Sequence, residues 1–154
     1  MGKAAITGWR DLLAPALTAE PPAAVWPFSG QLEDLLRPGR LVLAECYPGE
    51  YYHHLGVSFS IPRRGTRSGK RVQEEHRHNA GALRSWAEQN GVALSEALRA
   101  GILDGFGPAP GGEDAFDALI GLFGMLNVVL ANRPPGEPED EEIRRLEGGI
   151  LGQV

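Results

Sequence analysis

Apolar residues recur along this chain at helical spacing more often than at strand spacing, which predicts a helix-rich protein with few strands. Ser29 and Ser95 stand where helix N-caps are expected, and Asn90-Gly91 is typical of a helix end. Pro15 is expected to shorten or bend the first helix. The predicted helices span residues 7–17, 30–36, 51–55, 70–89, 96–102 and 114–131, with a short acidic helix in the tail.

Two of these helices carry a clear apolar face. The helix over residues 7–17 places Trp9, Leu12, Leu13 and Ala16 on one side. The helix over residues 70–89 has its predicted buried stripe at Ala80, Leu83, Trp86 and Ala87.

Residues 41–46 form the one convincing strand. Its apolar side chains stand at successive positions, which is typical of a parallel strand covered on both faces, so the predicted fold class is α/β. The backbone of such a strand needs neighbours for its N–H and C=O groups. Val25-Trp26 and Ile150-Leu151 are weak candidates. Either these pair with the strand, or strands from a segment outside this chain complete the sheet.

Composition narrows the class of protein. A chain of 154 residues suits one domain, here residues 1–154, and its single cysteine, Cys46, excludes a disulfide within the chain. We therefore expect a soluble protein of the reduced cytoplasmic compartment. The most apolar stretch, residues 115–131, is short for a membrane span and contains Asp117, which indicates a buried helix and no membrane association.

Charge is unevenly distributed. The net charge of −5 argues against a protein that coats nucleic acid generally, yet five basic residues cluster between positions 63 and 71 and acidic residues cluster over positions 137–142. The basic stretch either follows a phosphate backbone or is a solvated loop, and it lacks the aromatic residues of a stacking platform. The basic residues are Arg63, Arg64, Arg67, Lys70 and Arg71.

Three carboxylates are candidates for metal chemistry. Glu45 follows four apolar strand residues, so it pairs, binds a metal or lies at the exposed end of the strand. Asp114 and Asp117 share one helix face at a predicted helix start, where the helix dipole favours negative charge. The same spacing is typical of a capping box with Asp114 as the N-cap, and the pattern leaves both interpretations open.

Other chemistries find less support. His76 and His78 are two residues apart on a predicted helix, so they face different ways and cannot chelate one ion. Cys46 lacks a matching Cys-His arrangement, no spacing fits a zinc site, and no glycine-rich phosphate loop follows the strand.

Four motifs, taken together and in order, resemble a known family. The chain is similar over nearly its whole length to the domain-of-unknown-function family numbered four hundred and twenty-nine, which is a predicted nuclease family with a ribonuclease-H-like fold. The motifs are Val25-Trp26-Pro27-Phe28-Ser29-Gly30, Ala44-Glu45-Cys46-Tyr47-Pro48, Glu113-Asp114-Ala115-Phe116-Asp117-Ala118-Leu119 and Leu146-Glu147-Gly148-Gly149-Ile150-Leu151.

This resemblance implies a site. Glu45, Asp114 and Asp117 would hold Mg²⁺ or Mn²⁺ for phosphodiester hydrolysis, and Lys70 or Arg71 would lie near the phosphate of a nucleic-acid substrate. The chain departs from the family in lacking its first strand, whose carboxylate carries much of the metal binding, and in having Gly149 where the family usually has Trp.

We therefore expect the C-terminal, helix-rich portion of a ribonuclease-H-like domain that lacks its N-terminal strands. The alternative is a non-catalytic fragment or interaction domain in which the same acids cap helices. Unpaired strand edges predict a homo-oligomer, unless a missing N-terminal segment covers them.

Overall fold

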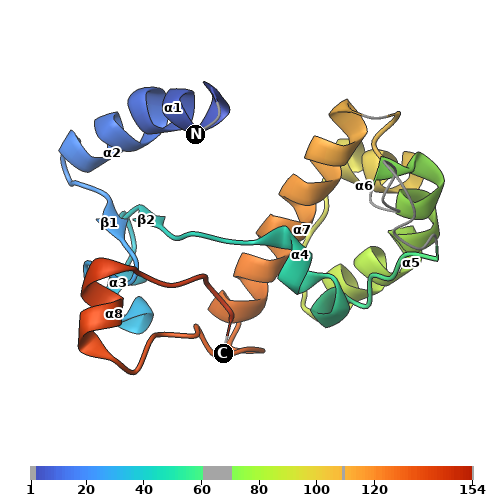
Figure 1. Cartoon of the computed structure of the whole chain (residues 1–154). Coiled ribbons are helices and arrows are strands. Elements are labelled where there is room, and N and C mark those ends of the chain that lie inside the picture. The colour runs from blue at the N-terminus through green and yellow to red at the C-terminus, as the bar shows by residue number, and fades with distance from the viewer. Residues whose placement is uncertain (1–2, 61–70, 109, 154) are drawn as a thin grey trace. The chain divides into compact units, whose positions relative to one another are not determined.

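The chain forms two structural units, which Figure 1 shows in a computed structural model. Unit 1 comprises Met1–Glu45 with Pro135–Val154, and unit 2 comprises Cys46–Pro134. The structure describes residues 3–60, 71–108 and 110–153, without the side chains of residues 3–5. Lys70 and the arginines at positions 63, 64 and 67 lie outside the described residues. As the sequence predicts, helices dominate, and the described strands form one parallel pair.

Unit 1 opens with a helix that contains a π turn. It runs through α1 (Lys3–Gly8), η1 (Trp9–Leu13) and α2 (Ala14–Thr18). The N–H of Ala14 donates to the carbonyl of Trp9, a π-type bond directly before Pro15, which has no N–H to donate. The predicted helix is therefore confirmed, with an earlier start. Its apolar face is largely exposed, since Trp9 is 60% and Leu12 71% accessible.

The unit 1 sheet is made of short segments. β1 (Ala24–Val25) and β2 (Val42–Leu43) pair in parallel, and an isolated parallel bridge joins Glu45 to Ile150. Both candidate partners of the predicted strand are thus confirmed. The prediction that both faces of this strand are covered is wrong, because Leu41 is 56% exposed and both residues of β2 are only half-buried. So small a sheet offers too little surface for helices to cover both faces.

Two acids of the acidic cluster organise the helices of unit 1. Glu137 Oε1 accepts hydrogen bonds from the indole N–H of the buried Trp26, at 3.1 Å, and from the N–H of Leu32, at 2.9 Å. Leu32 begins α3 (Leu32–Leu35), whose N-cap residue is Gln31, so the predicted capping role of Ser29 is wrong. Asp140 caps α8 (Glu141–Leu146) by accepting from two N–H groups of its first turn.

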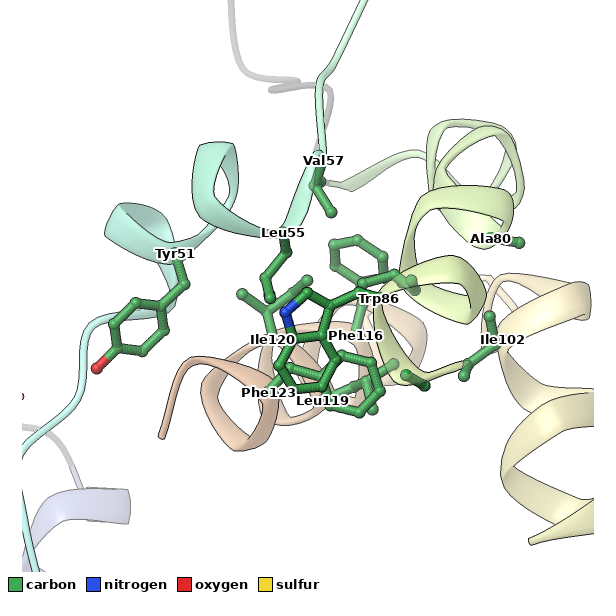
Figure 2. Packing of buried hydrophobic residues seen from close by; sticks show 12 residues of the cluster. Tyr51, Leu55, Val57, Ala80, Trp86, Ile102, Phe116, Leu119, Ile120 and Phe123 are labelled. Carbon is green, nitrogen blue, oxygen red and sulfur yellow. The ribbon is translucent and has the colours of Figure 1, made fainter. Parts of the chain in front are cut away.

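Unit 2 packs its helices around one apolar core (Figure 2). The core is built on α7 (Gly111–Val129), whose residues Phe116, Ile120 and Phe123 are at most 1% exposed. Trp86 stacks on Phe123, with ring centroids 4.5 Å apart, and its N–H donates to Asn127 Oδ1. The other elements are α4 (Pro48–Tyr51), η2 (His53–Leu55), α5 (Gln73–Gln89) and α6 (Glu96–Asp104).

α5 is buried on an apolar and a polar side. The predicted stripe at Ala80, Leu83, Trp86 and Ala87 is confirmed as buried. Beside it, Asn79 both accepts from and donates to the backbone of Ser58, at 2.9 and 2.8 Å. Glu75 accepts from the backbone N–H and the hydroxyl of Ser60. These bonds attach the segment after η2 to α5. Among the described residues, no helix is both long and apolar enough to cross a membrane.

The contact between α7 and α4 predicts a large effect at Gly124. A Cβ added there would collide with the ring of Tyr51, so we expect Gly124→Ala to lower the free energy of unfolding by about 1–3 kcal/mol. Gly81 is the control, because it lies on the exposed side of α5 with nothing near its Cβ position. Gly81→Ala should stabilise the chain by about 0.5–1 kcal/mol. Urea unfolding followed by circular dichroism measures both, and equal effects would contradict the packing.

Glu75 predicts an acid-sensitive contribution to stability. The hydrogen bonds from Ser60 hold the pKa of Glu75 below its ordinary value of 4.5. The stability that this group adds is therefore present above pH 4.5 and is lost as the pH falls further. Glu75→Gln should flatten the stability profile in that acidic range, measured by urea unfolding at several pH values. The control Glu74→Gln, at an exposed neighbouring residue, should keep the pH dependence of the native chain's stability. If Glu75→Gln also kept that pH dependence, this would count against the hydrogen bonds from Ser60.

Candidate functional site

The candidate acids of unit 2 lie in the first turns of α7. This helix begins at Gly111, after Pro110, and no side chain caps it. Asp114 lies inside the helix and donates its N–H to the carbonyl of Pro110 at 3.3 Å. The capping-box hypothesis for Asp114 and Asp117 is therefore wrong. The helix starts early because Gly112 lies against the backbone of Gly107, an approach that any Cβ would prevent.

Asp114 and Asp117 have different surroundings. Asp114 is exposed, and its carboxylate has no partner within the described part of the chain. Asp117 is half-buried and accepts a hydrogen bond from the hydroxyl of Tyr52 at 2.8 Å. Burial and this bond raise the pKa of Tyr52, so its proton stays in place as a donor. One acid is thus held in position and the other is open to a ligand.

Arg71 reaches the same end of α7. Its Nε lies 3.1 Å from Oε2 of Glu113, whose side chain is only 15% exposed. The terminal nitrogens of Arg71 have no partner among the described residues. Arg71 therefore pairs with the residue that directly precedes Asp114 in α7. The other predicted phosphate contact, Lys70, is outside the described residues.

Glu45 belongs to unit 1. Its carbonyl accepts from the N–H of Leu151 at 2.9 Å, and its side chain is exposed, as expected for a strand end. It borders a groove of about 800 Å³ with largely apolar walls. The groove is lined by Trp9, Leu13, Leu17, Val25, Trp26, Phe28, Ser29, Leu43, Ala44, Glu45, Glu147, Gly148 and Gly149.

The structure thus places Asp114 and Asp117 in the first turns of α7 and pairs Arg71 with Glu113 of the same helix end, whereas a shared site that also includes Glu45 stays a prediction. Within the described ranges, no three His, Cys, Asp or Glu side chains form a group that could hold a metal ion. Sequence reasoning missed Tyr52, because nothing in its local pattern indicates a partner 65 positions away.

The two histidines of α5 have different surroundings. His76 is buried and stacks on Phe116 with ring centroids 4.1 Å apart, and its Nδ1 lies 3.2 Å from the carbonyl of Gly105. His78 is exposed. The prediction that the two rings face different ways is confirmed.

Comparisons with protein-family models, with curated proteins and with solved structures find no match to this chain. The structure itself therefore shows a helix-rich fold with one described pair of parallel strands, which suits either an α/β or a mostly helical class. The ribonuclease-H-like assignment and its chemistry come from the sequence motifs and remain predictions.

The hydrogen bond between Tyr52 and Asp117 should appear as a coupling in stability. A double-mutant cycle of Tyr52→Phe with Asp117→Asn should give a coupling free energy of about 1–2 kcal/mol, because the bond involves a charged acceptor. The same cycle with Asp114→Asn should give less than about 0.5 kcal/mol, since Asp114 does not contact Tyr52. Chemical denaturation of the single and double variants measures both. Equal couplings would contradict the different surroundings of the two acids.

Proposed function

We propose that this chain is the helix-rich portion of a ribonuclease-H-like domain in which Asp114 and Asp117 hold Mg²⁺ or Mn²⁺ for phosphodiester hydrolysis. One observation carries the proposal: two carboxylates share a face of α7, and Arg71 is ion-paired to Glu113 directly beside them. An acid pair next to a cation suits a site that holds a metal and a phosphate at once.

The donor chemistry of this end of α7 fits a hard divalent cation. Mg²⁺ and Mn²⁺ prefer carboxylate oxygens, and Asp114 offers two that nothing else in the described chain occupies. A bound cation would polarise the phosphodiester and lower the pKa of a water molecule.

The remaining roles follow from charge and position. The hydroxyl of Tyr52 orients the carboxylate of Asp117 by donating a hydrogen bond to Oδ1. Arg71 presents its terminal nitrogens to a phosphate of nucleic acid, while Glu113 holds its Nε. Lys70 is proposed as a second phosphate contact and Glu45 as a third metal ligand.

A second function, a non-catalytic interaction domain that self-associates as a homo-oligomer, is favoured by a separate observation. Large apolar side chains of unit 1 are exposed, among them Leu12 at 71%, Leu41 at 56% and Phe28 at 53%. Apolar surface of this kind often marks a site of protein association.

Metal binding by calorimetry tests the first proposal. We expect Mn²⁺ to bind the native chain, and we expect the double variant Asp114→Asn/Asp117→Asn to lose that binding while its circular dichroism spectrum is unchanged. Glu141→Gln/Glu142→Gln is the matched control, because it removes an exposed acid pair from the first turn of another helix, α8. This control should bind Mn²⁺ like the native chain.

Two results would sink the metal proposal: no Mn²⁺ binding to the native chain, or binding that both double variants retain equally. Glu45→Gln tests the third ligand separately. Its affinity for Mn²⁺ should fall about 10-fold or more if Glu45 contributes an oxygen, and an unchanged affinity would remove Glu45 from the site.

A further inference from the structure

A pocket of unit 2 lies between α5 and α6, which pack against each other (Figure 1). It has a volume of about 450 Å³, and its surface is mostly polar, unlike that of the groove in unit 1. α5 contributes the residues at positions 81, 84, 85 and 88, which share one face of the helix. The other walls are formed by residues 92–94 and by Arg99 of α6. One unit therefore supplies the whole pocket.

Two arginines from different helices line this pocket. They are Arg84 of α5 and Arg99 of α6, and both are exposed. Within the described residues, neither guanidinium has an ion pair or a side-chain hydrogen bond. Arg77 of α5, by contrast, is paired with Asp104 at 2.9 Å. The residues of unit 2 that the structure does not describe contain neither Asp nor Glu. The positive charge of the two arginines is therefore available to a ligand.

Further hydrogen-bond donors accompany the arginines. Ser85 lines the pocket with its hydroxyl-bearing side chain. The backbone N–H groups of Ala93 and Leu94, in the extended segment before α6, have no acceptor among the described residues. Glu88 is the acid among the lining residues. Guanidinium, hydroxyl and backbone N–H groups are the donors with which proteins bind oxyanions.

Gly81 leaves the wall of the pocket clear. It lies inside α5, where glycine is less stable than alanine. A Cβ at this position would have no neighbour within 4 Å, whereas a Cβ at Gly124 of α7 would collide with Tyr51. Packing therefore does not require glycine at position 81. Its effect is to keep the space of the pocket free of a side chain.

We propose that this pocket binds a small phosphate monoester, whose phosphate lies on Arg84 and Arg99. Such a phosphate carries about two negative charges near neutral pH, which suits two guanidinium groups, whereas a carboxylate carries one. Each guanidinium can donate two parallel hydrogen bonds to phosphate oxygens. The organic part of the ligand lies against Val92 and Leu94, and the volume of the pocket suits a small molecule.

This inference is independent of the proposed metal site and of self-association. Its residues belong to α5, α6 and the segment between them, whereas the candidate metal acids lie in α7. The double variant Asp114→Asn/Asp117→Asn should therefore bind the phosphate monoester like the native chain, and EDTA should not weaken that binding. Failure of one proposal leaves the other in place.

Titration with phenyl phosphate, followed by the backbone amide signals in two-dimensional NMR spectra, tests the pocket. In a phosphate-free buffer with EDTA, we expect saturable shifts for Gly81, Ser85 and residues 92–99, and no such shifts in unit 1. Benzoate should bind at least about 5-fold more weakly, because it brings one negative charge. Equal or tighter binding of benzoate would overturn the assignment to a phosphate.

Charge variants test the two arginines. Arg84→Gln and Arg99→Gln should each raise the dissociation constant of phenyl phosphate about 10-fold, because each removes charge-assisted hydrogen bonds. Arg145→Gln is the matched control, since it removes the same charge from exposed α8, and should change the constant less than about 2-fold. Glu88→Gln should lower the constant about 2-fold, because it removes a negative charge beside the anion.

A variant at Gly81 separates a binding role from a structural one. Gly81→Leu fills the pocket without meeting other atoms near its Cβ, so it should raise the dissociation constant at least about 10-fold. Its unfolding temperature should stay the same or rise, because leucine favours a helix more than glycine does. Circular dichroism on heating measures that temperature.

The inference is overturned if phenyl phosphate causes no saturable shifts at the pocket. It is also overturned if Arg84→Gln and Arg99→Gln both bind phenyl phosphate as tightly as the native chain. A Gly81→Leu variant that remains folded and binds with unchanged affinity has the same consequence.

Discussion

The need to pair every polar group removed from water is the constraint on which both units depend. In unit 1, the strand segment that contains β2 therefore pairs with two short partners. β1 pairs with Val42 and Leu43, and Ile150 pairs with Glu45, and neither partner is long enough to pair with the whole segment. The constraint also brings Glu137 to the indole of Trp26. In unit 2, the buried side chains of Asn79 and Glu75 meet the same constraint by hydrogen bonding to the backbone of Ser58 and Ser60. Apolar burial builds the core, and these bonds determine which segments lie beside it.

α7 combines the two kinds of interaction in one helix. Its middle supplies the aromatic and aliphatic core of unit 2, and its first turns carry the candidate acids. A carboxylate on so firmly packed a helix has a fixed backbone position, and Tyr52 adds a fixed side-chain position for Asp117. A binding site placed on a rigid element in this way needs little rearrangement to accept a ligand.

Local rules account for what the sequence predicted well. The apolar stripe of α5 and the parallel pairing of β2 follow from periodicity and from backbone hydrogen bonding, and both are confirmed. Ser95 accepts from the N–H of Leu98 as an N-cap should. Ser29 and Asp114 match cap patterns equally well, yet neither caps a helix. In both cases the helix begins at another residue than the pattern indicated, and Gln31 and Pro110 occupy the N-cap positions of α3 and α7.

The candidate site was predicted only in part, for a related reason. The pattern placed Asp114 and Asp117 on one helix face, because that spacing is local. Tyr52 and Asp117 are 65 positions apart in the sequence, and Arg71 and Glu113 are 42 positions apart. No local sequence pattern indicates contacts between residues so far apart. Whether Glu45 joins these acids depends on tertiary structure that residue spacing does not encode.

The order of the two units along the chain has a consequence for folding. Unit 2 is one continuous segment, whereas unit 1 is assembled from two segments on either side of it in the sequence. Unit 2 can therefore fold as a unit from local contacts. Unit 1 has to close a long loop that contains the whole of unit 2 before Glu137 reaches Trp26 and Ile150 reaches Glu45, so a unit 2 that is already folded lowers the entropic cost of forming unit 1.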